Sequence, residues 1–183
     1  MDRRATGWFG RRVRIRETRI DESAELQRIE LAAGKLFHEV GMSDIAEHPL
    51  PPIATLEAYQ RAGRSWVIVD ERGPAGFVLV KLVDGLAHIE QISIDPAYAH
   101  RRLGAELIDH VASWAAAGNR SALTLSTFRQ VPWNAPYYAR LGFREVAPAE
   151  LGPELAELMA EEATHGLNPA DRVAMIRSIQ LRR

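Results

Sequence analysis

The residues best suited to chemistry lie near position 100, where a strand, a basic turn and a helix follow one another. The strand ends at an Asp-Pro pair (95–96), the turn holds Arg101 and Arg102, and a helix is expected from about Leu103. Backbone N–H groups in the first turn of a helix lack partners and bind anions, and Gly104 lets a ligand approach closely. The combination suits a pyrophosphate, although an ordinary strand-to-helix crossover with surface arginines has the same composition.

A second segment, Asn134-Ala-Pro-Tyr-Tyr-Ala-Arg-Leu-Gly-Phe143, places Tyr138 five residues before the Phe of a Gly-Phe pair. In this order, and with a strand between them, the two segments resemble the acyl-CoA-binding motif and the closing motif of the GNAT superfamily of N-acyltransferases. The first family pattern is Gln/Arg-x-x-Gly-x-Gly/Ala after a strand and an Asp-Pro turn. The elements expected over residues 13–180 also follow the family's order.

Both motifs depart from the family patterns. With Gly104 aligned to the second glycine, Ala99 stands where Gln or Arg is usual and Arg102 stands where the first glycine is usual. The asparagine usually found seven residues before the tyrosine is Val131 here, and Asn134 lies four residues before it. Asn134 either caps the following helix or contacts the pantetheine arm.

The resemblance implies transfer of an acyl group, usually acetyl, from acetyl-CoA to a primary amine. The amine must lose a proton to attack, so a base or a water-linked carboxylate assists. The developing oxyanion needs a donor, which in this family is a backbone N–H of a bulged strand. The leaving thiolate, whose thiol has a pKa of about 8.5, benefits from an acid. A chain without cysteine forms no acyl-cysteine, so we expect a sequential reaction with both substrates bound.

Tyr138 matches the family's position for the acid, and a phenol is a hydrogen-bond donor at neutral pH. Its neighbour Tyr137 is expected to point elsewhere and to join the core. The resemblance also implies coenzyme contacts from the strand end, the turn, the helix start and the closing motif. These residues are Ile92, Ile94, His100, Arg101, Arg102, Leu103, Gly104, Ala105, Asn134 and Tyr138.

Glu90 is the candidate base, because relatives carry a glutamate at a similar place that takes the amine's proton through water. Strand alternation puts His88, Glu90, Ile92 and Ile94 on one face unless a bulge changes the phase. Burying a carboxylate among aliphatic residues is costly, whereas a glutamate at a strand edge that faces solvent or an arginine is common. His88 is the alternative base.

The elements that must position these residues form the order β-α-α-β-β-β-α-β-α-β-α-β. Strands are expected over 13–17, 66–69, 77–83, 86–94, 122–126, 143–146 and 172–179. Helices are expected over 21–40, 53–61, 103–117, 134–141 and 150–163, with Asp21 as the first N-cap. Tight turns such as Asp84-Gly85 give antiparallel neighbours, and strand–helix–strand segments give parallel ones. The expected fold is α/β, with a mixed, mostly antiparallel central sheet flanked by helices on both faces.

The composition limits what else the chain can be. Its 183 residues, 46% hydrophobic and 26% charged, suit one globular domain, which we expect over 13–180. The absence of cysteine excludes disulfides, thiolate metal sites and Cys nucleophiles, and the histidines lack metal-ligand spacing, so no metal is expected. A net charge of −1 argues against a nucleic-acid partner. No apolar run approaches the ~20 residues of a membrane span, so we expect a cytoplasmic protein with no membrane partner.

Charge is unevenly distributed. Residues 1–19 hold seven Arg, and residues 145–162 hold six Glu with no basic residue. We interpret residues 1–12 as a solvated, flexible leader; a transit peptide or a phosphate-binding arm is the alternative.

The acceptor is left open. The family holds its acceptor with segments that correspond to about 36–52, 128–133 and 150–165, whose acidic residues suit a cationic amine as well as a solvated surface. A small amine and a protein amine are both compatible with this, as is a homodimer. A non-catalytic CoA-binding regulatory or interaction module is the competing interpretation, because Ala99 and Arg102 depart from the motif.

Overall fold

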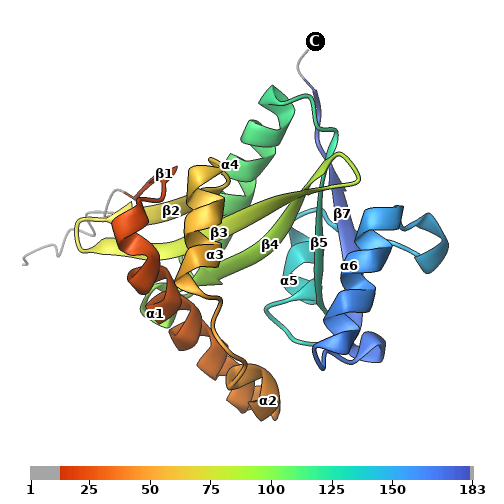
Figure 1. Ribbon diagram of the computed structural model, residues 1–183, viewed down its shortest axis with the longest axis horizontal. Helices are drawn as coiled ribbons and strands as arrows, with labels where there is room; N and C mark the ends of the chain where they lie inside the picture. The colour runs from red at the N-terminus through yellow and green to blue at the C-terminus, as the bar shows by residue number, and fades with distance from the viewer. Residues whose placement is uncertain (1–12, 182–183) are drawn as a thin grey trace, which may run out of the picture.

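The computed structural model describes residues 13–181, so the expected leader over 1–12 lies outside the described residues. Seven strands form one sheet in the order β1-β2-β3-β4-β5-β7-β6 (Figure 1). The β4–β5 pair is parallel and every other neighbouring pair is antiparallel. The expected mixed, mostly antiparallel sheet is therefore confirmed.

The strands are β1 (Arg14–Glu17), β2 (Ser65–Asp70), β3 (Gly73–Val83), β4 (Leu86–Ile94), β5 (Ala122–Phe128), β6 (Arg144–Glu145) and β7 (Arg172–Ser178). The helices are α1 (Ser23–Gly34), α2 (Ser43–Ala46), α3 (Ile53–Arg61), α4 (Leu103–Ala117), α5 (Ala135–Arg140) and α6 (Pro153–Thr164). Short 3-10 helices are η1 (Ile20–Glu22), η2 (Lys35–Val40), η3 (Pro96–Tyr98), η4 (Pro148–Glu150) and η5 (Pro169–Asp171).

The first helical segment differs from the expectation. It divides into η1, α1 and η2, and Asp21 lies inside η1 instead of capping a helix. Glu22, not Asp21, fixes the start of this segment. Its carboxylate accepts the backbone N–H of Arg19 at 2.9 Å and binds the Arg16 guanidinium at 2.6 Å. This ion pair joins β1 to the start of α1.

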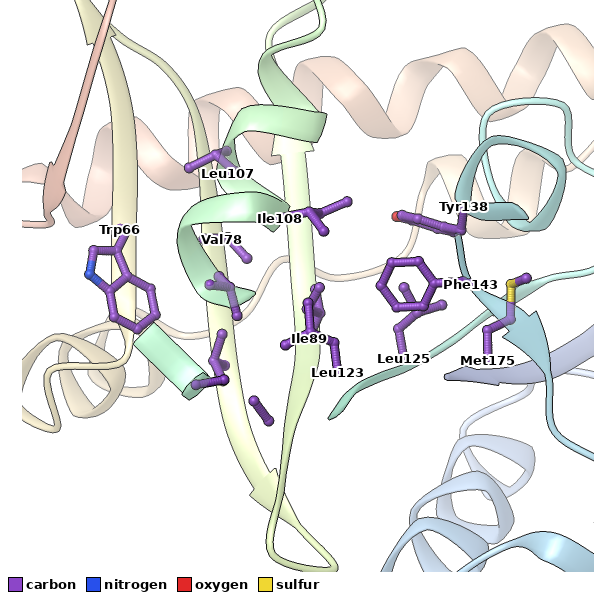
Figure 2. Close-up of a cluster of buried hydrophobic side chains, with 14 of the residues drawn as sticks. Trp66, Val78, Ile89, Leu107, Ile108, Leu123, Leu125, Tyr138, Phe143 and Met175 are labelled. Carbon is purple, nitrogen blue, oxygen red and sulfur yellow. The ribbon is translucent and has the colours of Figure 1, made fainter. Parts of the chain in front are cut away.

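Helices cover both faces of the sheet (Figure 1). One face packs against α4 and α5, and the main core lies there; Figure 2 shows Leu107 and Ile108 of α4 beside Ile89, Leu123 and Leu125 of the sheet. The other face packs against α1 and α3 through Leu26, Ile29 and Leu56. Near the β3–β4 hairpin, α6 covers this same face through Leu155.

The Asp84-Gly85 turn predicted from the sequence is confirmed, with left-handed φ of 51° and 73°. Asp84 also joins the hairpin to α6, since its carboxylate accepts the backbone N–H groups of Glu154 and Leu155 at 3.0 Å each. None of the helices within 13–181 has the length and apolar character that crossing a bilayer demands.

A glycine on β3 allows the end of β4 to approach. A Cβ on Gly76 would lie 2.4 Å from Ile94 Cδ1 and 2.8 Å from the backbone oxygen of Ser93. We therefore expect Gly76→Ala to lower the free energy of unfolding by about 1–3 kcal/mol through overpacking. Thermal unfolding checks this, with Gly34→Ala as the control, because a Cβ there meets only Ala46 O at 3.7 Å. Equal melting temperatures for the two variants would contradict it.

Candidate functional site

The sheet opens between its two parallel strands. Pairing of β4 with β5 runs only from Ala87–Leu123 to Ile89–Leu125. Beyond that point, the end of β4 stays bonded to β3, and the end of β5 stays bonded to β7. The β5-facing edge of β4, residues 90–94, is thus left without a neighbouring strand among the residues described. Such an edge offers backbone N–H and C=O groups to an extended ligand.

A bulge lies where the strands separate. Leu79 of β3 is opposite Gln91, and the next residue, Val80, is opposite Ile89, so Glu90 is the extra residue. One added residue reverses the facing of every side chain beyond it. Ile92 and Ile94 consequently share the α4 face with Ile89, and the prediction that they share a face with His88 is wrong.

The turn after β4 is held by Asp95. Its carboxylate accepts the backbone N–H of Ala97 at 2.9 Å and pairs with Arg28 of α1 at 2.8 Å. Burial acts to raise the pKa of Asp95, but these two hydrogen bonds outweigh it and lower the pKa. The aspartate therefore stays ionised and fixes α1 against the turn.

Two residues with side chains, neither of them glycine, have left-handed backbone conformations in this turn. His100 has φ of 63° and Arg102 has φ of 61°. Arg102 is the N-cap of α4 and stands where the family motif usually has its first glycine. The structure thus supplies a reason for that glycine, and here arginine adopts the same backbone at a cost of about 1–2 kcal/mol. The guanidinium groups of Arg101 and Arg102 belong to exposed residues beside the helix start.

The first turn of α4 presents backbone donors that have no partner within the helix, and the donor of Ala105 lies close to the Tyr137 hydroxyl. The first helical hydrogen bond runs from the N–H of Glu106 to Arg102 O at 3.1 Å, so the amides of Leu103, Gly104 and Ala105 precede the bonded part of the helix. These three residues are buried, yet their N–H groups lie at the positive end of the helix dipole. With the two arginines, these donors have the chemistry that suits a phosphate or pyrophosphate.

Gly104 brings three elements together. A Cβ on this residue would lie 3.8 Å from Ile94 Cγ1 at the end of β4 and 3.1 Å from the hydroxyl of Tyr137 on α5. The strand end, the helix start and the closing motif therefore meet at one point, as the sequence motifs predict.

Tyr137 is oriented differently from the expectation. Its hydroxyl faces the first turn of α4, close to the backbone N–H of Ala105. Burial raises its pKa, while the Ala105 N–H and the charge of Arg102 act in the opposite direction. Tyr137 is partly buried and packs against the main core, as expected, but its hydroxyl points toward the first turn of α4 and not away from it. Periodicity on a six-residue helix could not fix this direction.

Tyr138 lies deeper than Tyr137. It is 9% exposed and packs edge-on against Phe143 at 5.8 Å between ring centroids. In Figure 2 its hydroxyl points toward Ile108 of α4. Burial raises its pKa, so the phenol keeps its proton at neutral pH.

Asn134 occupies the N-cap position of α5, but its side chain makes no capping hydrogen bond. Its backbone oxygen accepts the N–H groups of Tyr137 at 2.8 Å and Tyr138 at 3.0 Å, which are the first hydrogen bonds of the helix. Of the two roles left open by the sequence, side-chain capping is not observed, and the amide remains available for a ligand.

The two candidate bases have different surroundings. Glu90 is at the bulge, and Lys81 Nζ donates to its Oε1 at 2.7 Å. His88 is 1% exposed, and its Nδ1 lies 3.0 Å from Thr124 Oγ1 of β5. Burial lowers the pKa of His88 to about 4. The histidine is thus a neutral, buried link between β4 and β5 at the place where they are still paired.

Sequence reasoning missed Glu30. This residue lies on α1, its Oε2 is buried, and no described residue hydrogen-bonds to that oxygen. Burial raises its pKa to about 7. The sequence did hold one signal for it. Glu30 is four residues after Leu26, and this spacing puts its carboxylate on the face of α1 that packs on the sheet.

Two other features lie apart from this site. A groove of about 550 Å³ runs between the C-terminal half of α4 and β7, lined by Ala112, Ser113, Ala116, Ala117, Arg177, Ser178, Ile179 and Gln180. It lies at the end of α4 opposite the basic turn. Within the described ranges, no three His, Asp or Glu residues are grouped as metal ligands would be.

Known proteins share this sequence pattern and fold. The acetyltransferase (GNAT) family profile matches residues 33–143. A GNAT acetyltransferase from Staphylococcus aureus Mu50 has a TM-score of 0.67 at 16% identity, over 92% of this chain and 100% of that chain. The Thermoplasma acidophilum PaiA N-acetyltransferase, solved with coenzyme A, has a TM-score of 0.68 at 15% identity, over 91% and 99%.

The ribosomal-protein-S18-alanine N-acetyltransferase from Escherichia coli has a TM-score of 0.64 at 16% identity, over 94% of this chain and 97% of that chain. At these identities the structural similarities establish a shared fold.

The buried carboxylate of Glu30 predicts a pH-dependent stability difference. A folded-state pKa of about 7, above the ordinary value of 4.5, means that its favourable contribution is complete below pH 4.5 and is lost as the pH rises through 7. Glu30→Gln should therefore be more stable than the wild type at pH 8, by about 2 kcal/mol after allowance for partial exposure. The two should be equal near pH 4.5.

Denaturant unfolding at pH 4.5 and pH 8 checks this, with Glu57→Gln as the control, since that carboxylate pairs with Arg61 on the surface of α3. A Glu30→Gln stability difference that is the same at both pH values would contradict a raised pKa.

Proposed function

The chain belongs to the acetyltransferase (GNAT) family, and we propose that it transfers an acetyl group directly from acetyl-CoA to a primary amine. The observation that carries this proposal is the opening between β4 and β5, which leads to the unpaired amides and arginines at the start of α4. An extended strand edge ending at an anion site matches a ligand with an amide-rich arm and a pyrophosphate.

The residues fit such a ligand. In our proposal the pyrophosphate binds the amides of residues 103–105 with Arg101 and Arg102, and the pantetheine arm follows β4 residues 90–94. Ile92 and Ile94 lie on the α4 face there. The Tyr137 hydroxyl lies beside Gly104, and the Asn134 side chain makes no capping hydrogen bond, so in our proposal its amide contacts the arm.

The chemistry requires one new bond and two proton movements. The amine nitrogen attacks the thioester carbonyl carbon, the C–N bond forms and the C–S bond breaks. The nitrogen's proton leaves to a base, and the sulfur of CoA gains a proton from an acid. A backbone N–H released by the bulge at Glu90 would stabilise the oxyanion.

We assign the base role to Glu90, acting through water, and the acid role to Tyr138. Glu90 is partly exposed at the point where β4 leaves β5. Its carboxylate accepts a hydrogen bond from Lys81 Nζ at 2.7 Å. Tyr138 is a buried phenol that packs against Phe143, and burial raises its pKa, so it holds a proton that the leaving thiolate would take.

A non-catalytic CoA-binding module is the second candidate, favoured by Ala99 and by Arg102 at the family's glycine position. A panel of primary amines, including alkylamines, aryl-alkylamines, polyamines, amino acids and peptides, separates the two functions by CoA thiol release. Turnover with any amine supports the transferase. Tight acetyl-CoA binding without turnover of the panel would support the module.

Substituting Gly104 tests the placement of the pyrophosphate. Gly104→Asp adds a carboxylate beside the amides and places a Cβ 3.1 Å from the Tyr137 hydroxyl. We expect acetyl-CoA affinity to fall at least tenfold, an effect of about 1.4 kcal/mol. Calorimetric titration measures it, with Gly104→Ala separating bulk from charge. Unchanged acetyl-CoA affinity in Gly104→Asp would contradict the placement of the pyrophosphate at the start of α4.

Kinetics of three variants test the acid and the base. Tyr138→Phe should lower kcat by about 10²-fold, as expected for loss of a general acid, with the KM for acetyl-CoA little changed. Tyr137→Phe should instead raise that KM, because its hydroxyl faces the start of α4. Glu90→Gln should lower kcat, because the variant lacks the carboxylate that would accept the amine's proton. Wild-type kcat in Tyr138→Phe would remove this residue from the mechanism.

A further inference from the structure

The acceptor side of the opening contains an unexplained carboxylate. Helix α1 contacts both β3 and β4 on the face opposite α4. Arg28 of α1 reaches Asp95 at the end of β4, so this part of the helix crosses the sheet where β4 has left β5. Glu30 lies half a turn further along.

The direction of Glu30 follows from its neighbours on the helix. Leu26 and Glu30 are four residues apart on α1 and so lie on one stripe of this helix, which runs toward Phe37 in the following 3-10 helix η2. Leu26 packs over β2 and β3, and Phe37 contacts Phe128 at the end of β5. Glu30 lies between them on the stripe and so faces the separated segment of β4, where its Oε2 is buried without a partner.

Three aromatic residues, Phe37, Phe128 and Trp133, form an aromatic wall beyond the end of α1 toward which this stripe runs. Phe37 lies 5.6 Å from Phe128 and 5.7 Å from Trp133, measured between ring centroids, in edge-to-face geometry. Phe37 and Trp133 are only partly buried. Phe37 lies in η2, which follows α1 directly, so the wall is beyond the C-terminal end of the helix that carries Glu30.

A buried carboxylate without a partner is costly, and a cation supplied by a ligand would remove the cost. Glu90 and Glu30 differ in this respect, because Glu90 already pairs with Lys81, whereas no described residue hydrogen-bonds to Glu30 Oε2. The aromatic wall adds no carboxylate, and the guanidinium of Arg172 lies over the Phe128 ring, 4.7 Å from its centroid. The unpartnered carboxylate of Glu30 and the aromatic wall therefore favour a ligand with one amino group and an apolar body.

Building on the proposed function, we propose that Glu30 binds the amino group of the acceptor and that the aromatic wall holds an apolar body attached to it. The acceptor is then a monoamine carried on an aliphatic or aromatic chain, and Glu30 is a specificity-determining residue of the acceptor site. Polyamines, which would bring a second cation to the wall, are poor acceptors.

Binding to the CoA-loaded protein tests this without requiring turnover. The probes are 4-phenylbutylamine and its neutral counterpart 4-phenyl-1-butanol, titrated calorimetrically at pH 8, where Glu30 is ionised and the amine is protonated. We expect the wild type to bind the amine at least tenfold more tightly than the alcohol. Glu30→Gln should abolish this preference, and Glu57→Gln, on the surface of α3, should retain it. Trp133→Ala should weaken the binding of both probes by the same factor, because the two share the apolar body.

Equal binding of the two probes by the wild type, failure of the amine to bind, or a preference retained in Glu30→Gln would overturn the inference. The thiol-release assay separates it from the proposed function. Acetylation of other amines with unchanged KM in Glu30→Gln refutes the role of Glu30 and leaves the transferase intact. A Glu30-dependent amine preference without any acetylation supports the acceptor site and refutes catalysis.

Discussion

The separation of β4 from β5 is the constraint on which the rest of the site depends. Three residue pairs join the strands, ending at Ile89–Leu125, and the buried contact between His88 and Thr124 lies within this short region. The bulge at Glu90 follows at once, so that the strand bends away and changes the facing of its side chains. A single extra residue thus accompanies the open edge of β4 and turns Ile92 and Ile94 to the α4 face of the sheet.

The anion site depends on backbone conformation as much as on charge. Arg102 in the left-handed region directs the chain into α4, so that three amides meet at the mouth of the opening. Glycine would adopt this conformation without strain. Arginine accepts the strain and contributes a cation at the same position, which is how the departure from the family motif remains compatible with phosphate binding.

The sequence predicted the features that local chemistry determines. The Asp84-Gly85 hairpin, the helix after Arg102 and the convergence of the two motifs at Gly104 follow from turn residues, periodicity and family pattern. Tertiary pairing determines the rest. β7 inserts between β5 and β6, the bulge re-faces Ile92, and Tyr137 points to the site, because these depend on contacts between distant segments. Glu30 escaped notice because a single glutamate in an amphipathic helix resembles a solvated residue until its burial is known.

Amide hydrogen exchange with and without acetyl-CoA tests the central claim most directly, since it reports where the ligand lies along the backbone. Binding in the opening predicts slower exchange at residues 90–94 and 103–105, with little change in the last turns of α4 and in β7. Protection confined to the groove between α4 and β7, or none at 90–94 and 103–105 when the protein is saturated with acetyl-CoA, would contradict the account.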